Sequence, residues 1–194
     1  MSLTTKDIDQ AINFKNCLGI NVKIGLKTRS SLKEKKYHNV QFGDVLFYQF
    51  LQSIGLTPAK SKTMGELKIP SEYFFDFLRG CLDGDGCFHS YWDPRWRSSY
   101  MFYLTFASAS FKHLLWLQEE IQKITGAKGR ISGRQKNVFF QLRYAKKGAV
   151  EIIKQMYYTQ KVVCLSRKRI KIEKALLIEK KQQKEYKKPG WRNW

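Results

Sequence analysis

The protein is long enough and apolar enough to bury a sizeable core, with 194 residues of which 43% are hydrophobic and 14% aromatic. Lys and Arg number 36 against 16 Asp and Glu, and the net charge of +20 favours a polyanionic partner, most simply nucleic acid. The sequence excludes a membrane span and a secretory signal, and its four cysteines without C-x-x-C spacing argue against a zinc site or a disulfide framework. We therefore expect an intracellular protein, in the cytoplasm or nucleoid, or in an organelle if the cell is eukaryotic.

The hydrophobic pattern predicts a mixture of helices and strands. In chain order we expect a helix at 7–18, strands at 22–27 and 37–42, helices at 45–54 and 72–86, a strand from 88 to the loop at 91–99, a strand at 101–110, a helix at 111–125, strands at 130–132 and 138–144, and helices at 148–158 and 166–180. Pro189 and Gly190 stop any later helix, so residues 181–194 are expected to form a basic tail.

The beginning of the chain resembles its second half, segment by segment. Helix 7–18 corresponds to 111–125, strand 22–27 to 129–134, strand 37–42 to 138–143, helix 45–54 to 149–156, and the basic stretch 59–62 to 165–168. Because five segments match in the same order, we infer an internal duplication.

The duplication is incomplete, since residues 72–109 have no counterpart before residue 7. The chain therefore divides into a partial first repeat that lacks one helix, a linker, a complete repeat and a basic tail. The corresponding ranges are 1–58, 59–70, 71–180 and 181–194.

The segment Phe74–Phe88, FFDFLRGCLDGDGCF, concentrates the features that indicate chemistry. Gly80 and Gly84 fall on one face of the predicted helix, where each costs roughly 1 kcal/mol relative to alanine, so another backbone is expected to approach there. Asp85 follows at the helix C-terminus, against the field of the helix dipole, and a bound cation would explain an acid at that place. The alternative is a turn in which the Asp side chains bind nearby amides, whereas the spacing excludes an EF-hand.

The nine residues Leu78–Gly86, LRGCLDGDG, resemble the LAGLIDADG motif of homing endonucleases, and the flanking F-x-x-F-L-R-G pattern is common in that family. The resemblance covers essentially residues 5–178. It implies an α+β fold of αββαββα repeats, with motif helices packed at a pseudo-two-fold interface. It also implies a saddle-shaped antiparallel sheet whose concave face enters the major groove of double-stranded DNA.

The resemblance further implies roles for single residues. Asp85, assisted by the carbonyl of Gly84, would bind a divalent cation, usually Mg²⁺, that promotes phosphodiester hydrolysis. Asp83 would cap or pack the helix interface, and Ser110 at the end of the second strand would orient the catalytic water. Lys168 would lie near the phosphate, with a plain contact to the DNA backbone as the alternative.

Basic and polar side chains on the strands are candidates for DNA contacts. Gln141 and Arg143 share one face of strand 138–144, together with Phe139, and can pair with adenine and guanine. Whether the odd-numbered or the even-numbered residues of strand 101–106 face the groove stays open. The further basic candidates of this region are Lys128, Arg130, Arg134 and Lys136.

The loop at 91–99 offers Arg95 and Arg97 between Trp92 and Trp96. These side chains either grip phosphates or, in the case of the tryptophans, close the edge of the core. Both possibilities follow from the same composition, so the sequence leaves them open.

Only one motif is present, whereas the family uses two motif helices. Three interpretations follow: two copies pair as a homodimer through their 72–86 helices, the missing helix belonged to a longer or split parent, or the protein is a degenerate member that binds DNA without cutting it.

The leading hypothesis is a metal-dependent homing endonuclease of intron, intein or freestanding origin. The alternative is a non-catalytic, maturase-like binder of DNA or intron RNA; a structural role would leave the charge unexplained. No membrane or small-molecule substrate is expected as a partner.

Overall fold

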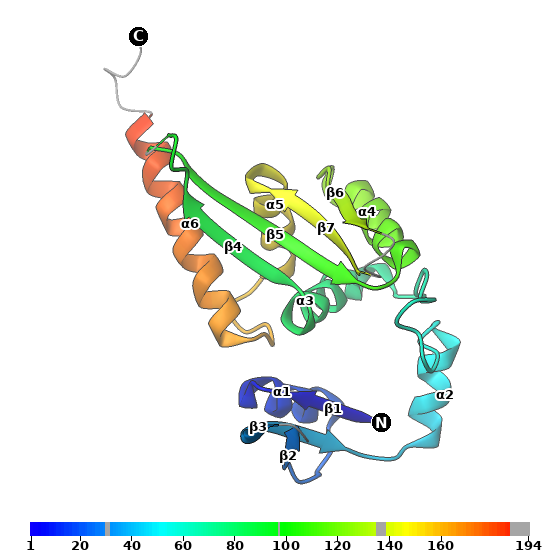
Figure 1. Ribbon diagram of the computed structural model, residues 1–194. Coiled ribbons are helices and arrows are strands. Elements are labelled where there is room, and N and C mark those ends of the chain that lie inside the picture. The colour runs from blue at the N-terminus through cyan, green and yellow to red at the C-terminus, as the bar shows by residue number, and fades with distance from the viewer. Residues whose placement is uncertain (30–31, 97, 135–138, 187–194) are drawn as a thin grey trace.

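The structure is a computed structural model that describes residues 1–29, 32–96, 98–134 and 139–186 (Figure 1). It has an α+β fold with two antiparallel sheets, as the sequence predicts. The N-terminal part contains a three-stranded sheet of order β1-β3-β2 and two helices. Its elements are β1 (Ser2–Thr5), α1 (Ile8–Leu18), β2 (Gly25–Arg29), β3 (Leu32–Gln41) and α2 (Val45–Ser53).

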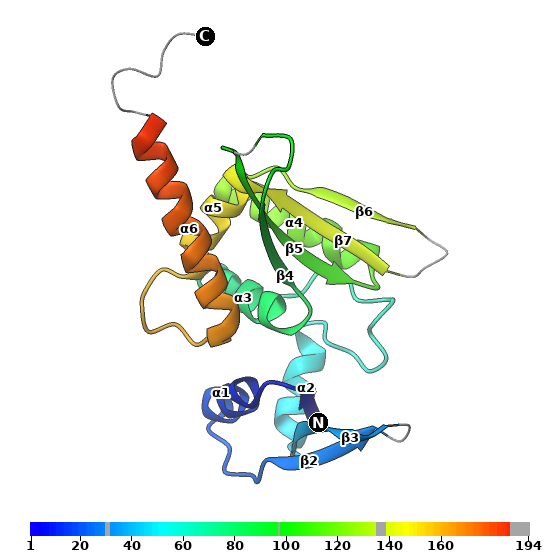
Figure 2. The ribbon, with the colours of Figure 1, turned by 60° about the vertical axis from the view of Figure 1, so that its left-hand side comes forward.

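The larger C-terminal part is built around a four-stranded sheet of order β4-β5-β7-β6. Its elements are η1 (Ser71–Tyr73), α3 (Phe74–Gly84), β4 (Cys87–Trp92), β5 (Tyr100–Ser108), α4 (Phe111–Thr125), β6 (Arg130–Arg134), β7 (Phe139–Ala145), α5 (Lys146–Met156) and α6 (Ser166–Tyr186). Figures 1 and 2 show α3, α4 and α5 on one face of this sheet and α6 beside β4. No helix of the described ranges is long and apolar enough to cross a membrane.

Strand β5 shows why the sheet has one covered face. Its residues Phe102, Leu104 and Phe106 are buried, because the side chains of alternate residues point to the same face. They pack in one core with Leu142 and Tyr144 of β7 and with the apolar sides of α3, α4 and α5. The odd-numbered residues of β5 consequently point to the opposite face, which no helix of the described residues covers (Figures 1 and 2).

The duplication inferred from the sequence is visible in the topology. The series β1-α1-β2-β3-α2 has the same order as β5-α4-β6-β7-α5, and the sheet order β1-β3-β2 repeats β5-β7-β6. Residues Ser2–Thr5 were not expected to be a strand, yet they pair with β3 as β5 pairs with β7. The expectation that residues 72–109 have no counterpart before residue 7 is therefore wrong for β5, and holds for α3 and β4.

Most element boundaries agree with the sequence prediction to within a few residues. The predicted helix 72–86 begins with a 3-10 turn and ends at Gly84. The last helix continues to Tyr186, so residues 181–186 belong to α6 and not to the expected basic tail. Residues 187–194 lie outside the described ranges.

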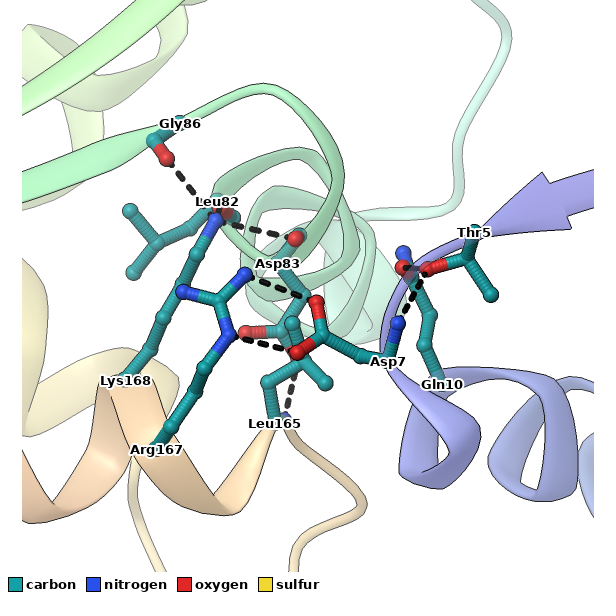
Figure 3. Close-up of polar contacts among 9 residues, drawn as sticks. All are labelled: Thr5, Asp7, Gln10, Leu82, Asp83, Gly86, Leu165, Arg167 and Lys168. Atoms are coloured by element: carbon teal, nitrogen blue, oxygen red, sulfur yellow. Dashed lines mark hydrogen bonds and ion pairs between the residues drawn. The ribbon is translucent and has the colours of Figure 1, made fainter. Parts of the chain in front are cut away.

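Polar contacts hold the N-terminal part against the C-terminal part. Asp7, the N-cap residue of α1, forms an ion pair with Arg167, in which two guanidinium nitrogens lie 2.7 Å from the carboxylate oxygens (Figure 3). These hydrogen bonds lower the pKa of Asp7. The amide of Asn13 donates to the carbonyl of Cys164 at 3.1 Å. Helix α1 is thus fastened to the loop that precedes α6 and to its first turn.

Candidate nucleic-acid and metal site

The motif helix α3 is anchored by one apolar stripe. Phe74, Leu78 and Leu82 lie four residues apart and are buried in the core. Directly after the helix, a Cβ at Gly86 would lie 2.6 Å from the Cα of Leu82. Only glycine therefore lets the chain turn from α3 into β4 so closely, and this turn fixes where Asp85 lies.

The opposite side of α3 carries the two exposed glycines of the motif. A Cβ at Gly80 or at Gly84 would meet nothing within 4 Å. The close approach of another backbone, expected from these glycines, is therefore not made by any described residue of the chain.

Asp85 is exposed and terminates α3, with its backbone N–H donating to the carbonyl of Cys81 at 3.2 Å. It lines a hollow together with Lys60, Ser61 and Ser108. Burial, reinforced by the charge of Asp85, raises the pKa of the Cys81 thiol to about 12, so this thiol is neutral at physiological pH. The hollow thus combines one carboxylate with a lysine from the linker between the repeats.

Lys168 of α6 lies against the same helix end, next to Leu82, Asp83 and Gly86 (Figure 3). Its ammonium donates hydrogen bonds to the carbonyls of Leu82, Asp83 and Gly86, at 2.5, 2.9 and 2.8 Å. The side chain is buried, and this burial lowers its pKa. Lys168 holds the C-terminal carbonyls of α3, where a cation is favoured by the helix dipole. Its expected place near the scissile phosphate, or on the DNA backbone, stays a prediction.

Asp83 belongs to the same junction and packs α3 against the residue before α6. Its Oδ2 accepts the backbone N–H of Leu165 at 2.8 Å, which ties α3 to the residue before α6. Its Oδ1 is buried and has no hydrogen-bond partner in the described structure. Burial is the main reason why the pKa of this carboxyl is raised.

Ser110 is buried at the N-terminus of α4. Its hydroxyl donates to the carbonyl of Met64 at 2.5 Å and accepts the N–H of His113, so it acts as the N-cap of the helix. The hydroxyl thus has a structural role, and its expected role in orienting water stays a prediction. His113 donates from Nδ1 to the Gly65 carbonyl, and burial lowers its pKa. Both residues fasten the linker to the core.

The uncovered face of the four-stranded sheet is polar and basic. In one row across the sheet Cys87 pairs with Thr105, Thr105 with Arg143, and Arg143 with Arg130. A neighbouring row joins Ala107, Gln141 and Ser132. The odd-numbered residues Thr105 and Ala107 of β5 pair with Arg143 and Gln141 of β7. Tyr103, which is also odd-numbered, therefore lies on the same face of the sheet as Gln141 and Arg143.

Aromatic rings support the basic groups of this face. The guanidinium of Arg143 lies 5.6 Å from the ring centre of Tyr103. The ring centres of Tyr103 and Tyr91 are 6.3 Å apart. Arg130 and Lys128 line a hollow next to Arg143. Interleaved cations and aromatics are suited to phosphates and bases.

Three of the predicted DNA-contacting residues cannot be placed by their side chains. Arg97 and Lys136 lie outside the described residues. Arg134 ends β6, and its side chain is likewise not described.

Arg95 lies at the far end of the sheet and is exposed, and it pairs with Asp93 at 3.2 Å. Trp96 is 69% exposed, so it does not close the core edge. Trp92 is 49% exposed, and its ring lies 5.0 Å from that of Tyr100. This loop meets the C-terminal half of α6, where Gln182 donates to the Ser98 carbonyl.

The donor set at the end of α3 is small for a metal ion. No three His, Cys, Asp or Glu side chains of the described part are close enough together to hold one. Asp85 supplies a carboxylate, and the Gly84 carbonyl is not among those that Lys168 binds. Mg²⁺ takes one or two carboxylates and completes its shell with water and phosphate oxygens. These residues therefore fit Mg²⁺ as part of a site that DNA and a further acid complete.

Sequence reasoning missed Lys60, Ser61 and Tyr91 as members of these two surfaces, and it left open which way Tyr103 faces. The linker residues could be found only through the match of 59–62 with 165–168. The aromatic residues follow from strand alternation once one face of β5 is known to be buried.

The fold and the motif helix define a protein with a LAGLIDADG-like fold. No protein-family model matches the chain, and no curated protein matches its sequence. The likeness lies in the structure, and the sequence identities below 15% show the fold alone.

Two solved structures illustrate the likeness. The meganuclease I-SmaMI bound to uncleavable DNA is 13% identical, with a TM-score of 0.57 over 95% of this chain and 79% of that one. The N-terminal LAGLIDADG domain of DUF199/WhiA is 12% identical, with a TM-score of 0.51 over 90% of this chain and 75% of that one. The first is a meganuclease bound to DNA, and the second is a LAGLIDADG domain of DUF199/WhiA.

Proposed function

We propose that the protein is a site-specific double-stranded DNA endonuclease of the homing type, dependent on Mg²⁺ or another divalent cation. The observation that supports this most strongly is Asp85, an exposed acid at the end of a motif helix beside a basic, uncovered sheet. The fold shared with DNA-bound meganucleases and the net charge of +20 agree with double-stranded DNA as the partner.

Each part of the chain has a distinct task in this proposal. The basic face of Arg130 and Arg143 binds DNA, and Gln141 beside it reads base edges. Lys168 and Gly86 hold the end of α3, so that Asp85 is presented in a fixed position. When bound, a divalent cation would supply charge stabilisation at the phosphate and activate water. Lys60, which lines the same hollow, would add positive charge near that phosphate.

The second candidate function is binding of DNA or intron RNA without cleavage, as in a maturase-like or degenerate relative. It is favoured by the small donor set at the site, because no group of three or more His, Cys, Asp or Glu side chains among the described residues could hold a metal ion. The structural likeness to the WhiA domain agrees equally well with this function.

The homodimer through the 72–86 helix stays a prediction. It would bring two copies of Asp85 together across Gly80 and Gly84. Helix α1 is tied to Arg167 and Cys164, so such a dimer would have to form beside these contacts or break them.

A cleavage assay on a pool of randomised duplex DNA tests the proposal, with Asp85→Asn as the variant. Asp9→Asn is the matched control, since Asp9 is an exposed acid on α1. We expect Mg²⁺-dependent cleavage in the wild type and in the control, and binding without cleavage in Asp85→Asn. Cleavage that persists in Asp85→Asn contradicts the assigned role, and binding without cleavage in any divalent cation supports the second function.

A further inference from the structure

We propose that the β4–β5 half of the uncovered sheet face binds unpaired nucleotides, whose bases stack on a row of aromatic rings. The ligand class is single-stranded DNA or an unpaired stretch of RNA, which share accessible base faces on an anionic backbone. Binding of this kind rests on the same nucleic-acid-binding face as the proposed function. It adds a second class of ligand to that face, and it does not require that the protein cuts duplex DNA.

The rings come from two adjacent strands. His89 and Tyr91 lie two residues apart on β4 and therefore share one face, and Tyr103 of β5 pairs directly with His89. The ring centres of His89 and Tyr91 are 5.4 Å apart. Those of Tyr91 and Tyr103 are 6.3 Å apart, and the two ring planes differ by only 18°. The three rings form one continuous group, which we call the aromatic row.

The aromatic row is accessible from solvent. His89 is exposed, Tyr91 is 37% exposed and Tyr103 is half-buried, whereas Phe88 and Phe102 on the other face are buried in the core. No helix of the described residues lies over this face (Figures 1 and 2). Tyrosine on such a surface offers a rigid apolar body with a polar tip, which suits it to interfaces.

Cations border the aromatic row on the side of β7. The guanidinium of Arg143 lies 5.6 Å from the ring centre of Tyr103, and Arg143 pairs with Arg130 of β6. Tyr103, Lys128, Arg130 and Arg143 also line one hollow. The face therefore passes from rings on β4 and β5 to cations on β7 and β6. A phosphate backbone held by these cations would bring its bases over the rings.

This arrangement favours unpaired bases over paired ones. A duplex presents base edges in its grooves, and hydrogen bonds from side chains such as Arg and Gln read these edges. The faces of paired bases are stacked on one another and are not accessible to a protein ring. Aromatic side chains on a sheet stack instead on the faces of unpaired bases, with little dependence on the base. Gln141 and Arg143 fit the first task, and the aromatic row fits the second.

The experiment compares labelled probes of about 12 nucleotides by fluorescence anisotropy. The probes are oligo-dT, oligo-rU, an abasic strand with the same number of phosphates, and a mixed-sequence duplex. The abasic strand keeps the backbone charge and lacks the base faces. We expect the full chain to bind oligo-dT or oligo-rU at least about tenfold more tightly than the abasic strand, because stacking adds to the electrostatic attraction.

Substitutions in the aromatic row then test the rings. Tyr91→Val is expected to weaken binding of the preferred single strand by about 5-fold to 150-fold, the range of one lost stacking contact. Tyr103→Val, on the neighbouring strand, should have the same effect. Valine is chosen because it is a good strand former, so the sheet is retained. Tyr91→Phe keeps the ring and should bind within about twofold of the wild type.

Tyr73→Val is the matched control. Tyr73 is 60% exposed and lies in the turn that leads into α3, away from the aromatic row. This substitution removes an exposed tyrosine ring as well, and it should leave the affinity for all single strands unchanged.

The outcomes separate the sources of the ligand. Tighter binding of oligo-rU supports the proposal with RNA as the ligand, and tighter binding of oligo-dT supports it with single-stranded DNA. Equal affinity for the two strands, with weaker binding of the abasic strand, supports a platform that both can use.

Four results would overturn the proposal. They are an affinity for the abasic strand that equals that for oligo-dT and oligo-rU, wild-type binding by both valine variants, a Tyr91→Phe variant as weak as Tyr91→Val, and an equal loss of affinity for the duplex and the single strand. The cleavage assay with Asp85→Asn is independent of these results. A protein that cuts duplex DNA but binds single strands without regard to their bases overturns the stacking proposal alone.

Discussion

Lys168 Nζ lies 2.8 Å from the carbonyl oxygen of Gly86, the residue that follows Asp85. The same ammonium binds two carbonyls in the last turn of α3, so one lysine of α6 spans the end of the motif helix and the start of the next strand. The position of the exposed acid is therefore set by a buried cation from a different element. This arrangement leads to predictions on stability as well as on activity.

Lys168→Met is expected to lower the free energy of unfolding by about 2 to 3 kcal/mol, because three carbonyls lose a charged donor. Urea denaturation measures the effect. Lys171→Met, at an exposed position of the same helix, is expected to change stability by less than about 0.5 kcal/mol. Equal stability of the two variants would contradict the capping role of Lys168.

Asp83→Asn is expected to raise stability at neutral pH. The pKa of Asp83 is raised by burial, so on raising the pH the unfolded chain loses its proton before the folded one, and the carboxylate then costs stability. Asparagine keeps an oxygen for the Leu165 N–H and carries no charge. The advantage of the variant should be present above the folded pKa and fade as the pH falls toward 3.8, the unfolded value. Thermal melts at several pH values that show a pH-independent difference would refute this prediction.

Two glycines of the same motif are expected to respond in opposite directions to alanine. Gly80→Ala should stabilise the chain by about 0.5 to 1 kcal/mol, since the new methyl meets nothing and helix propensity improves. Gly86→Ala should destabilise it, because the Cβ would lie 2.6 Å from the Cα of Leu82. The pair is compared by chemical denaturation, and a loss of stability in Gly80→Ala would show that this face is already packed.

The sequence alone predicts the fold class well because the periodic patterns are strong. The helix predicted at 111–125 has the bounds of α4, and the motif glycines place the end of α3 to within two residues. The order of matching segments also predicts the duplication. Strand β1 was missed because its four residues are too few to show alternation.

The functional side chains were harder to predict, because their roles depend on contacts between distant segments. Lys168 and Ser110 have the residue types of a catalytic site, and both also donate hydrogen bonds to backbone carbonyls that lie 46 or more positions away in the sequence. The hollow at Asp85 includes Lys60 from the linker, which no local pattern connects with the motif. In contrast, Gln141 and Arg143 were placed correctly on one face, because strand alternation is a local property.

The uncovered face of the four-stranded sheet is expected to bind duplex DNA. The most direct test is the affinity for duplex DNA as a function of salt, for Arg143→Gln against Lys154→Gln. Lys154 is 63% exposed on α5, which packs on the covered face of the sheet, so both variants lose one surface charge. If Arg143 contacts a base, we predict that Arg143→Gln weakens binding by about 1 to 3 kcal/mol. If it contacts a phosphate, the slope of the logarithm of the binding constant against the logarithm of the salt concentration should become smaller by about one. Lys154→Gln should have neither effect. Equal, small effects of the two substitutions would contradict the claim.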